Sequence, residues 1–265
     1  MKKKIALHIF IVTILTVLTQ IGGIIYLMSL IFSKRNKWNK YKFISLFIGL
    51  YLTFTILVVP IIAPIFGRVP LPLNGKIQPL SIFTPFLNRH YVTPKLKSSL
   101  VNVSNEFQHK YSDYSINYLD ANFPFIDGFR LLPHLSHGDG NKIDIAFLFQ
   151  DTLGNPTNSA RSPIGYGIHE SPSGNEINYT EICISKGAYQ YDLIRFFVPK
   201  WNSEKYKLDS EATSELISLL SHENNAKILL EPHLKRRWGL SSIDNIRFQG
   251  CHAVRHDDHI HFQVK

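Results

Sequence analysis

Four of the twelve histidines fall within the last fourteen residues of the chain, in a pattern suited to metal or acid–base chemistry. The chain ends His256-Asp257-Asp258-His259-Ile260-His261-Phe262-Gln263-Val264-Lys265. Alternation with period two predicts a strand that presents His259, His261 and Gln263 on one face and buries the residues between them. Two imidazoles at i and i+2 can share a cation, or one can bind it while the other acts on a substrate. A solvated histidine tract is the alternative, but the interleaved apolar residues favour a strand within a sheet.

A second stretch, residues 136–147, supplies further metal-binding side chains. His137 lies in a glycine-rich turn. The residues after it alternate as in a strand, so that the side chain of Asp144 lies on the face opposite the apolar Ile143 and Ile145. The turn lets His137 fold back over the strand that presents Asp144. Two histidines and one carboxylate with an open fourth position are the composition of a catalytic zinc site. Alone, His-x6-Asp is better explained by a structural turn; combined with His-x-His it indicates a metal site.

The two stretches together resemble a family of zinc metallopeptidases that unites lysostaphin-type enzymes, D-Ala-D-Ala peptidases and the hedgehog signalling domain. The terminal motif is most similar to the penicillin-insensitive murein endopeptidase branch, whose His-Asp-x-His-x-His pattern matches residues 256–261. The resemblance implies that His137, Asp144 and His261 bind Zn²⁺, that His259 is catalytic and that His256 is an auxiliary group. It covers residues 130–147 and 250–265. In the D-Ala-D-Ala branch a Glu stands where this chain has Asp258, which leaves the general base open.

Zinc held by three protein ligands lowers the pKa of its bound water to about 7, so that the water can attack an amide carbonyl. A neighbouring base must then take the proton. His259 shares a strand face with His261, so we expect His259 to be this base, with His256 second and Asp258 third. Asp257 and Asp258 can instead orient the imidazoles as hydrogen-bond acceptors.

Two arginines are candidates for binding a substrate carboxylate, because Arg pairs with carboxylates through two parallel hydrogen bonds. Arg130 precedes the His137 turn, and Arg236 lies in a basic run at residues 231–238. A solvated basic loop is the more common explanation of such a run.

The N-terminal third contains two long uncharged runs, Ile5–Phe32 and Phe43–Gly67. About 20 apolar residues suffice to cross a bilayer as a helix, so the sequence predicts two transmembrane helices within residues 1–68. A cleaved signal peptide is the alternative for the first run, which is long for one and lacks a small-residue exit. The loop between the runs carries five positive charges. The positive-inside bias then places the loop in the cytoplasm and the long C-terminal part outside. The membrane expected from the resemblance to cell-wall peptidases is a bacterial inner membrane.

The rest of the chain divides into a proline-rich linker, residues 69–94, and a domain, residues 95–265. We expect an α+β domain with a small, mostly antiparallel sheet and few helices. The expected helices are Lys95–Tyr111 and Asp209–His222. The expected strands are Ile116–Leu119, Lys142–Gln150, Glu176–Ser185, Lys227–Leu230 and Asp258–Val264. Cys183 and Cys251 can pair or remain free thiols.

Composition limits the function further. The chain is 45% hydrophobic and 18% charged, which excludes a disordered polymer. The net charge is +9, but residues 1–105 carry thirteen basic and no acidic residues, whereas residues 106–265 carry sixteen basic against twenty acidic residues. The C-terminal part is therefore mildly acidic, and nucleic acid is not an expected partner. Together with the resemblance, these observations predict a membrane-anchored zinc peptidase. The resemblance and the expected location imply that its substrate is a peptidoglycan peptide. A non-catalytic zinc-containing binding or sensing domain, or a metal-dependent nuclease, is the alternative.

Overall fold

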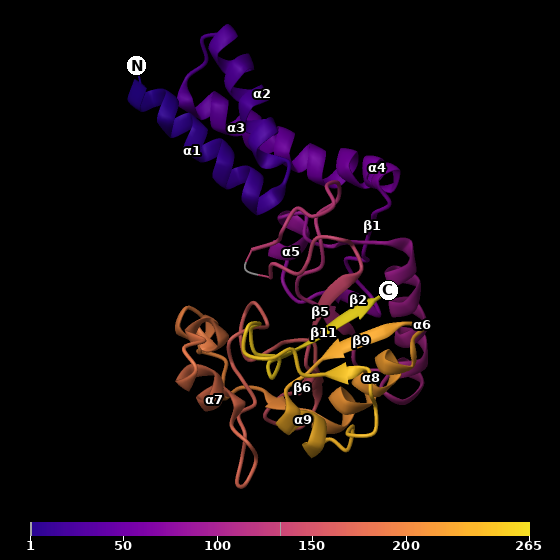
Figure 1. Cartoon of the computed structure of the whole chain (residues 1–265). Helices are drawn as coiled ribbons and strands as arrows, with labels where there is room; N and C mark the ends of the chain where they lie inside the picture. The colour runs from indigo at the N-terminus through magenta and orange to yellow at the C-terminus, as the bar shows by residue number, and fades with distance from the viewer. Residues whose placement is uncertain (1, 133) are drawn as a thin grey trace.

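The computed structural model describes residues 2–132 and 134–265, which form a helical anchor followed by a mixed α+β domain (Figure 1). The anchor consists of α1 Lys2–Thr19, α2 Gly22–Arg35, α3 Lys40–Thr53, the π-helical turn η1 Phe54–Val58, α4 Val59–Ile62 and the 3₁₀ turn η2 Ala63–Phe66. The last four elements run on as one helix, Lys40–Phe66, of 27 residues, which contains an 18-residue stretch with a mean hydropathy of 2.5. At 1.5 Å per residue this helix is about 40 Å long, enough to cross a bilayer.

The prediction of two transmembrane helices is wrong for the first of them, the run Ile5–Phe32. The run Ile5–Phe32 is broken at Gln20, whose φ is +65°, into two helices of 18 and 14 residues. Among the described residues, Lys40–Phe66 is the one helix long and apolar enough to span a membrane. Small residues let the two helices pack closely beside the break. A Cβ on Gly23 would lie 2.0 Å from Thr16 Oγ1, so only glycine at this position lets α2 approach α1 this closely. Composition could not distinguish one long helix from this hairpin.

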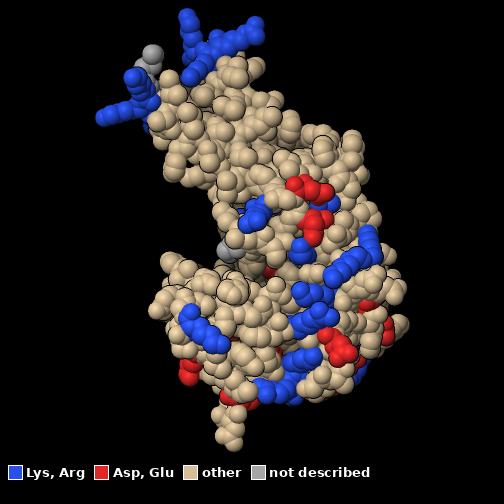
Figure 2. Space-filling model, viewed as in Figure 1, with Lys and Arg blue, Asp and Glu red and all other residues tan. Residues whose placement is uncertain are grey.

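The hairpin returns the chain to the end at which it began. The N-terminus and the connection between α2 and α3 lie at the same end of the anchor, and the basic side chains of the anchor gather there (Figures 1 and 2). The turn of the hairpin lies at the opposite end, against the domain, where Gln20 Oε1 accepts a hydrogen bond from the Phe125 backbone N–H at 3.0 Å. Tyr51 of α3 likewise donates to the Phe86 carbonyl at 2.7 Å. The anchor therefore packs directly on the domain.

Residues 69–94 are part of the domain, not the free linker that their prolines suggested. They form β1 Val69–Pro70, β2 Ile77–Pro79, α5 Phe83–Phe86 and β3 Tyr91–Val92. Strand β2 pairs in parallel with β4 Ile116–Tyr118 and is an edge strand of the main sheet. Its proline is tolerated because an edge strand has one side without ladder hydrogen bonds.

The main sheet has six strands in the order β10-β9-β11-β5-β4-β2. Its remaining strands are β5 Lys142–Ala146, β9 Ala226–Leu229, β10 Ile246–Arg247 and β11 His259–Val264. The central pairs β9–β11, β11–β5 and β5–β4 are antiparallel, and the edge pairs β10–β9 and β2–β4 are parallel. The α+β class is thus confirmed, with a mixed sheet and more helices than expected.

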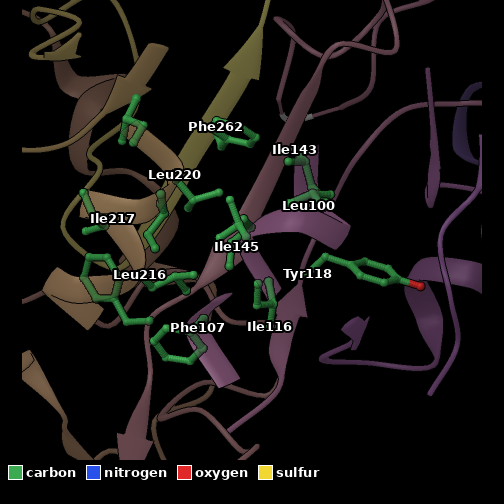
Figure 3. Close-up of a cluster of buried hydrophobic side chains, with 14 of the residues drawn as sticks. Leu100, Phe107, Ile116, Tyr118, Ile143, Ile145, Leu216, Ile217, Leu220 and Phe262 are labelled. Carbon is green, nitrogen blue, oxygen red and sulfur yellow. The ribbon is translucent and has the colours of Figure 1, made fainter. Parts of the chain in front are cut away.

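One face of the sheet is covered by two helices, α6 Pro94–Lys110 and α8 Ser210–His222. The sequence predicted both helices, but not their place on the sheet. Both begin at side-chain caps: Thr93 Oγ1 accepts from Leu96 N–H, and Asp209 Oδ1 accepts from Ala212 N–H. Their apolar faces pack with the sheet into the main hydrophobic core, part of which is drawn in Figure 3. The core includes Ile143, Ile145, Ile260 and Phe262, all with 0% of their surface exposed. The predicted alternation of β5 and β11 is therefore confirmed.

Two predicted strands differ in the structure. Residues 176–185 contain helix α7 Tyr179–Ser185, because the Asn178 side chain accepts from the backbone N–H groups of Thr180 and Glu181 and so caps a helix. The strand expected at Lys142–Gln150 is divided into β5 and β6 Phe149–Gln150, which joins β7 Pro156–Thr157 and β8 Lys207–Leu208 in a second sheet. The other elements are the 3₁₀ turns η3 Tyr189–Asp192 and η4 Ile194–Phe196, and helix α9 Pro232–Arg237.

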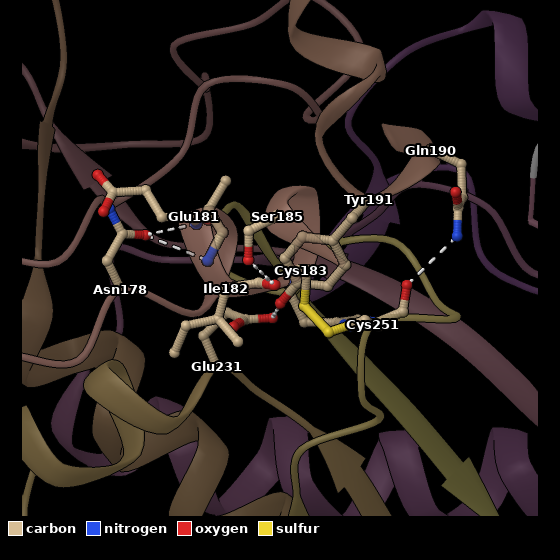
Figure 4. Close-up of a disulfide and its surroundings, with 11 residues drawn as sticks. Asn178, Glu181, Ile182, Cys183, Ser185, Gln190, Tyr191, Glu231 and Cys251 are labelled. Atoms are coloured by element: carbon tan, nitrogen blue, oxygen red, sulfur yellow. Dashed lines mark hydrogen bonds between the residues drawn. A yellow bond between two sulfur atoms is a disulfide. The ribbon is translucent and has the colours of Figure 1, made fainter. Parts of the chain in front are cut away.

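Cys183 of α7 and Cys251 form a disulfide (Figure 4). It joins positions 68 residues apart and ties α7 to the segment that leads into β11. In the chain-entropy account, closing a loop of this length stabilises the fold by about 4 kcal/mol. The bond thus restrains the segment that carries His256.

Candidate metal centre

The pairing of β11 with β5 places two of the predicted site residues side by side. His261 lies directly opposite Asp144 in the antiparallel register, and both side chains project from the sheet face opposite α6 and α8. His261 Nδ1 is 2.8 Å from Asp144 Oδ1. The side-chain alternation that buries Ile260 and Phe262 therefore also brings the imidazole to the carboxylate.

His137 reaches the same carboxylate from the turn before β5. Its Nε2 is 3.2 Å from Asp144 Oδ1 and 3.2 Å from His261 Nδ1. Its Nδ1 is 2.7 Å from the Ala121 carbonyl oxygen, which can only accept a hydrogen bond. This contact fixes the proton on Nδ1 and leaves the Nε2 lone pair directed at Asp144 and His261, as in ligating histidines whose second nitrogen donates to a carbonyl.

His134 and Tyr166 approach the second oxygen of the carboxylate. His134 Nδ1 lies 2.9 Å from Asp144 Oδ2, and the Tyr166 hydroxyl donates to the same atom at 2.9 Å. His134, His137 and Asp144 are all buried, and their ligand atoms lie within 4.8 Å of one another, so this group can hold a metal ion. Sequence reasoning missed His134 and Tyr166, although the three-residue spacing of His134 and His137 was a signal that could have been used.

The donor set fits zinc. Tetrahedral Zn²⁺ with bonds of about 2.0–2.1 Å separates its ligand atoms by roughly 3.3 Å. His137 Nε2, Asp144 Oδ1 and His261 Nδ1 are separated by 2.8–3.2 Å, close to this value. His134 contacts the other carboxylate oxygen, Asp144 Oδ2. We therefore take His137 Nε2, Asp144 Oδ1 and His261 Nδ1 as the candidate metal-binding atoms.

The charge state of the group also suits a cation. Burial lowers the pKa of His261 to about 4, so its imidazole is neutral near pH 7 and has a free lone pair. Burial alone would raise the pKa of Asp144, but the surrounding imidazoles of His137, His134 and His259 hold it well below its usual range. A neutral imidazole beside an ionised carboxylate is the protonation state that metal binding requires.

His259 lies next to this group with one ring nitrogen free. Its Nδ1 contacts the Asp258 carboxylate, which also accepts a hydrogen bond from the Gly167 backbone N–H. Its Nε2 is buried without a hydrogen-bond partner and is 3.7 Å from Asp144 Oδ1. Asp258 therefore orients His259, and the free nitrogen is directed at the space beside the carboxylate.

A buried polar network lies behind Asp258. His169 Nδ1 is 2.9 Å from Asp257 Oδ1 and 3.4 Å from Asp258 Oδ2. Arg255 pairs with Asp257, and at 2.8 Å with Asp192. Burial alone would raise the pKa values of Asp257 and Asp258. His169 and Arg255 outweigh this effect at Asp257, and His169 and His259 outweigh it at Asp258, so both pKa values lie below the usual range. The network keeps Asp258 ionised and in place.

The candidate metal centre opens into one cavity of about 810 Å³, here called the central cavity. His256 lies in its wall, with its ring centroid 5.1 Å from that of His259 and 5.7 Å from that of His261. Burial and these two neighbours lower the pKa of His256 well below its usual value. The lining also includes the apolar side chains of Leu193, Ile194, Phe197 and Val198. This volume can accommodate a peptide segment.

The structure brings five of the predicted site residues together and leaves two apart. His137, Asp144, His256, His259 and His261 converge. Arg130 and Arg236 are exposed, and neither lines the central cavity. Arg236 lies in α9, outside the sheet face that carries the histidines. Their basic character was visible in the sequence, but nothing local indicated where each would lie.

Comparison with known proteins adds no assignment. No protein-family model matches the chain, and no curated protein matches its sequence. The function must therefore be argued from the geometry of the centre.

Proposed function

We propose that this protein is a membrane-anchored zinc peptidase of the lysostaphin and D-Ala-D-Ala peptidase group, which hydrolyses an amide bond in peptidoglycan peptides. The observation that carries the proposal is the convergence of His137 Nε2, Asp144 Oδ1 and His261 Nδ1 beside the unpartnered Nε2 of His259. Because His259 lines the central cavity, this nitrogen is available to a water molecule or a substrate group there.

The proposed roles follow from the contacts. Zinc, when bound by His137, Asp144 and His261, supplies an acidified water and polarises the substrate carbonyl. His259 Nε2 accepts the proton of the attacking water, while Asp258 holds the other ring nitrogen and stabilises the imidazolium that forms. His259 then returns the proton to the leaving amine.

Digestion of purified muropeptides by the full chain in detergent tests this activity. We expect cleavage that is abolished by a zinc chelator and restored by added Zn²⁺. Zinc-loaded protein that binds muropeptides without cleaving them would support the binding-domain alternative. Nicking of nucleic acid under the same conditions would support the nuclease.

Within the same proposal, the anchor is a re-entrant hairpin, α1 and α2, followed by one spanning helix. Lengths support this arrangement, because the 14 residues of α2 extend only about 21 Å, short of a bilayer core of about 30 Å. Charge supports it too: the lysines at the N-terminus and those of residues 34–42 are at one end of the anchor, so the positive-inside bias acts on both in the same direction. The domain then lies outside the cytoplasm, where the Cys183–Cys251 disulfide is stable.

Cysteine labelling with a membrane-impermeant maleimide checks the topology. Single reporters at Lys3→Cys and Asn36→Cys are expected to react only after cells are permeabilised, whereas Ser241→Cys in the domain reacts in intact cells. The native cysteines are paired and do not interfere. Labelling of Lys3→Cys from outside, with Asn36→Cys protected, would instead establish the two-span arrangement.

A further inference from the structure

A row of side chains next to the candidate metal centre carries positive charge. The register aligns Lys142 of β5 and Lys227 of β9 on either side of Gln263 of β11. The preceding row on the same sheet face is Asp144, His261 and Leu229. Because strands rise about 3.3 Å per residue, the two rows lie roughly 7 Å apart.

The lysine row lines the central cavity and is neutralised only in part. Of the described residues that line this cavity, Asp258 is the single acid, and it is engaged with His259. Lys142 pairs with the half-exposed Asp139 at 2.6 Å. Lys227 Nζ donates to Gln249 Oε1 at 3.3 Å and has no ion-pair partner in the described part of the chain.

The surrounding charge is also positive. Burial lowers the pKa of Lys227, and Arg247, Lys265 and Lys142 lower it further. Basic side chains gather on the molecular surface where the strands β9 and β11 lie (Figure 2). Like charges held together are costly unless an anion binds between them.

We propose that Lys142 and Lys227 form an anion-binding subsite, which takes a free carboxylate of the substrate peptide within one to two residues of the attacked carbonyl. The proposal rests on the peptidase function proposed above and names a feature of its substrate. Gln263, between the two lysines, offers amide hydrogens to the same carboxylate. The subsite fulfils the role that the sequence suggested for Arg130 and Arg236.

A matched pair of probes tests the subsite: diacetyl-L-Lys-D-Ala-D-Ala with a free C-terminal carboxylate, and the same peptide as its C-terminal amide. The zinc-loaded full chain in detergent is expected to show a KM about tenfold lower for the acid than for the amide, the scale of one charge-assisted contact. Lys142→Gln and Lys227→Gln should each reduce this preference to threefold or less. Lys205→Gln, an exposed lysine outside the cavity, should leave it unchanged, and 0.5 M NaCl should weaken it in the wild type.

Direct binding to the His259→Ala variant separates this proposal from the peptidase function. Tighter binding of the acid than of the amide, lost in Lys142→Gln and Lys227→Gln, supports the subsite even if neither probe is cleaved. Cleavage of both probes with equal KM, or an acid preference that survives both lysine substitutions, overturns the subsite and leaves the peptidase function standing.

Discussion

His137→Ala is expected to lose zinc and peptidase activity together. In the proposed site this imidazole would supply one of three donor atoms, and its Nδ1 contact with the Ala121 carbonyl fixes the tautomer whose Nε2 can bind the ion. Loss of an outer hydrogen-bond partner typically weakens metal affinity by 10- to 100-fold, so loss of a ligand should exceed about 100-fold. Zinc content after dialysis, measured by elemental analysis, and muropeptide cleavage check this result.

His222→Ala is the matched control for that variant, because His222 is an exposed histidine of α8 on the other side of the sheet. It should retain both zinc and activity. Full zinc content and unchanged cleavage in His137→Ala would contradict the assignment of this residue as a ligand.

His259→Ala is expected to retain zinc but lose turnover. A positioned general base contributes about 10²- to 10⁴-fold, so kcat should fall by that factor with little change in KM. Asp258→Asn should lower kcat less, because the amide still contacts the imidazole but stabilises its protonated form poorly. Steady-state kinetics with zinc content measured in parallel test both variants.

A different pattern would reassign the base. If His259→Ala kept most of its kcat while a His256→Ala variant lost it, proton transfer would belong to His256, whose ring centroid lies 5.1 Å from that of His259 in the lining of the same cavity. A parallel loss of zinc in His259→Ala would make it a ligand.

The sequence predicted the strand that carries His259 and His261 because alternation along one strand is a local property. It also predicted α6 and α8, whose capping residues and apolar spacing are local too. The resemblance implied that Asp144 and His261 bind one metal ion, but the pairing of their two strands is seen only in the structure.

Features that depend on distant parts of the chain were not predictable in this way. The break at Gln20 depends on close packing of α2 against α1 at Gly23, which a hydropathy count does not detect. By contrast, the helix within residues 176–185 was missed although its Asn178 cap is a local signal, and only its disulfide to Cys251 depends on a distant segment. His134 reaches Asp144 from an irregular segment, and no periodicity places such a residue.

Zinc anomalous scattering from crystals of the metal-loaded protein tests the central claim most directly. The account predicts one strong peak per chain, about 2.0–2.2 Å from His137 Nε2, an Asp144 oxygen and His261 Nδ1, with an open position facing the central cavity. A zinc peak elsewhere, or none at this group in protein that cleaves muropeptides, would contradict it.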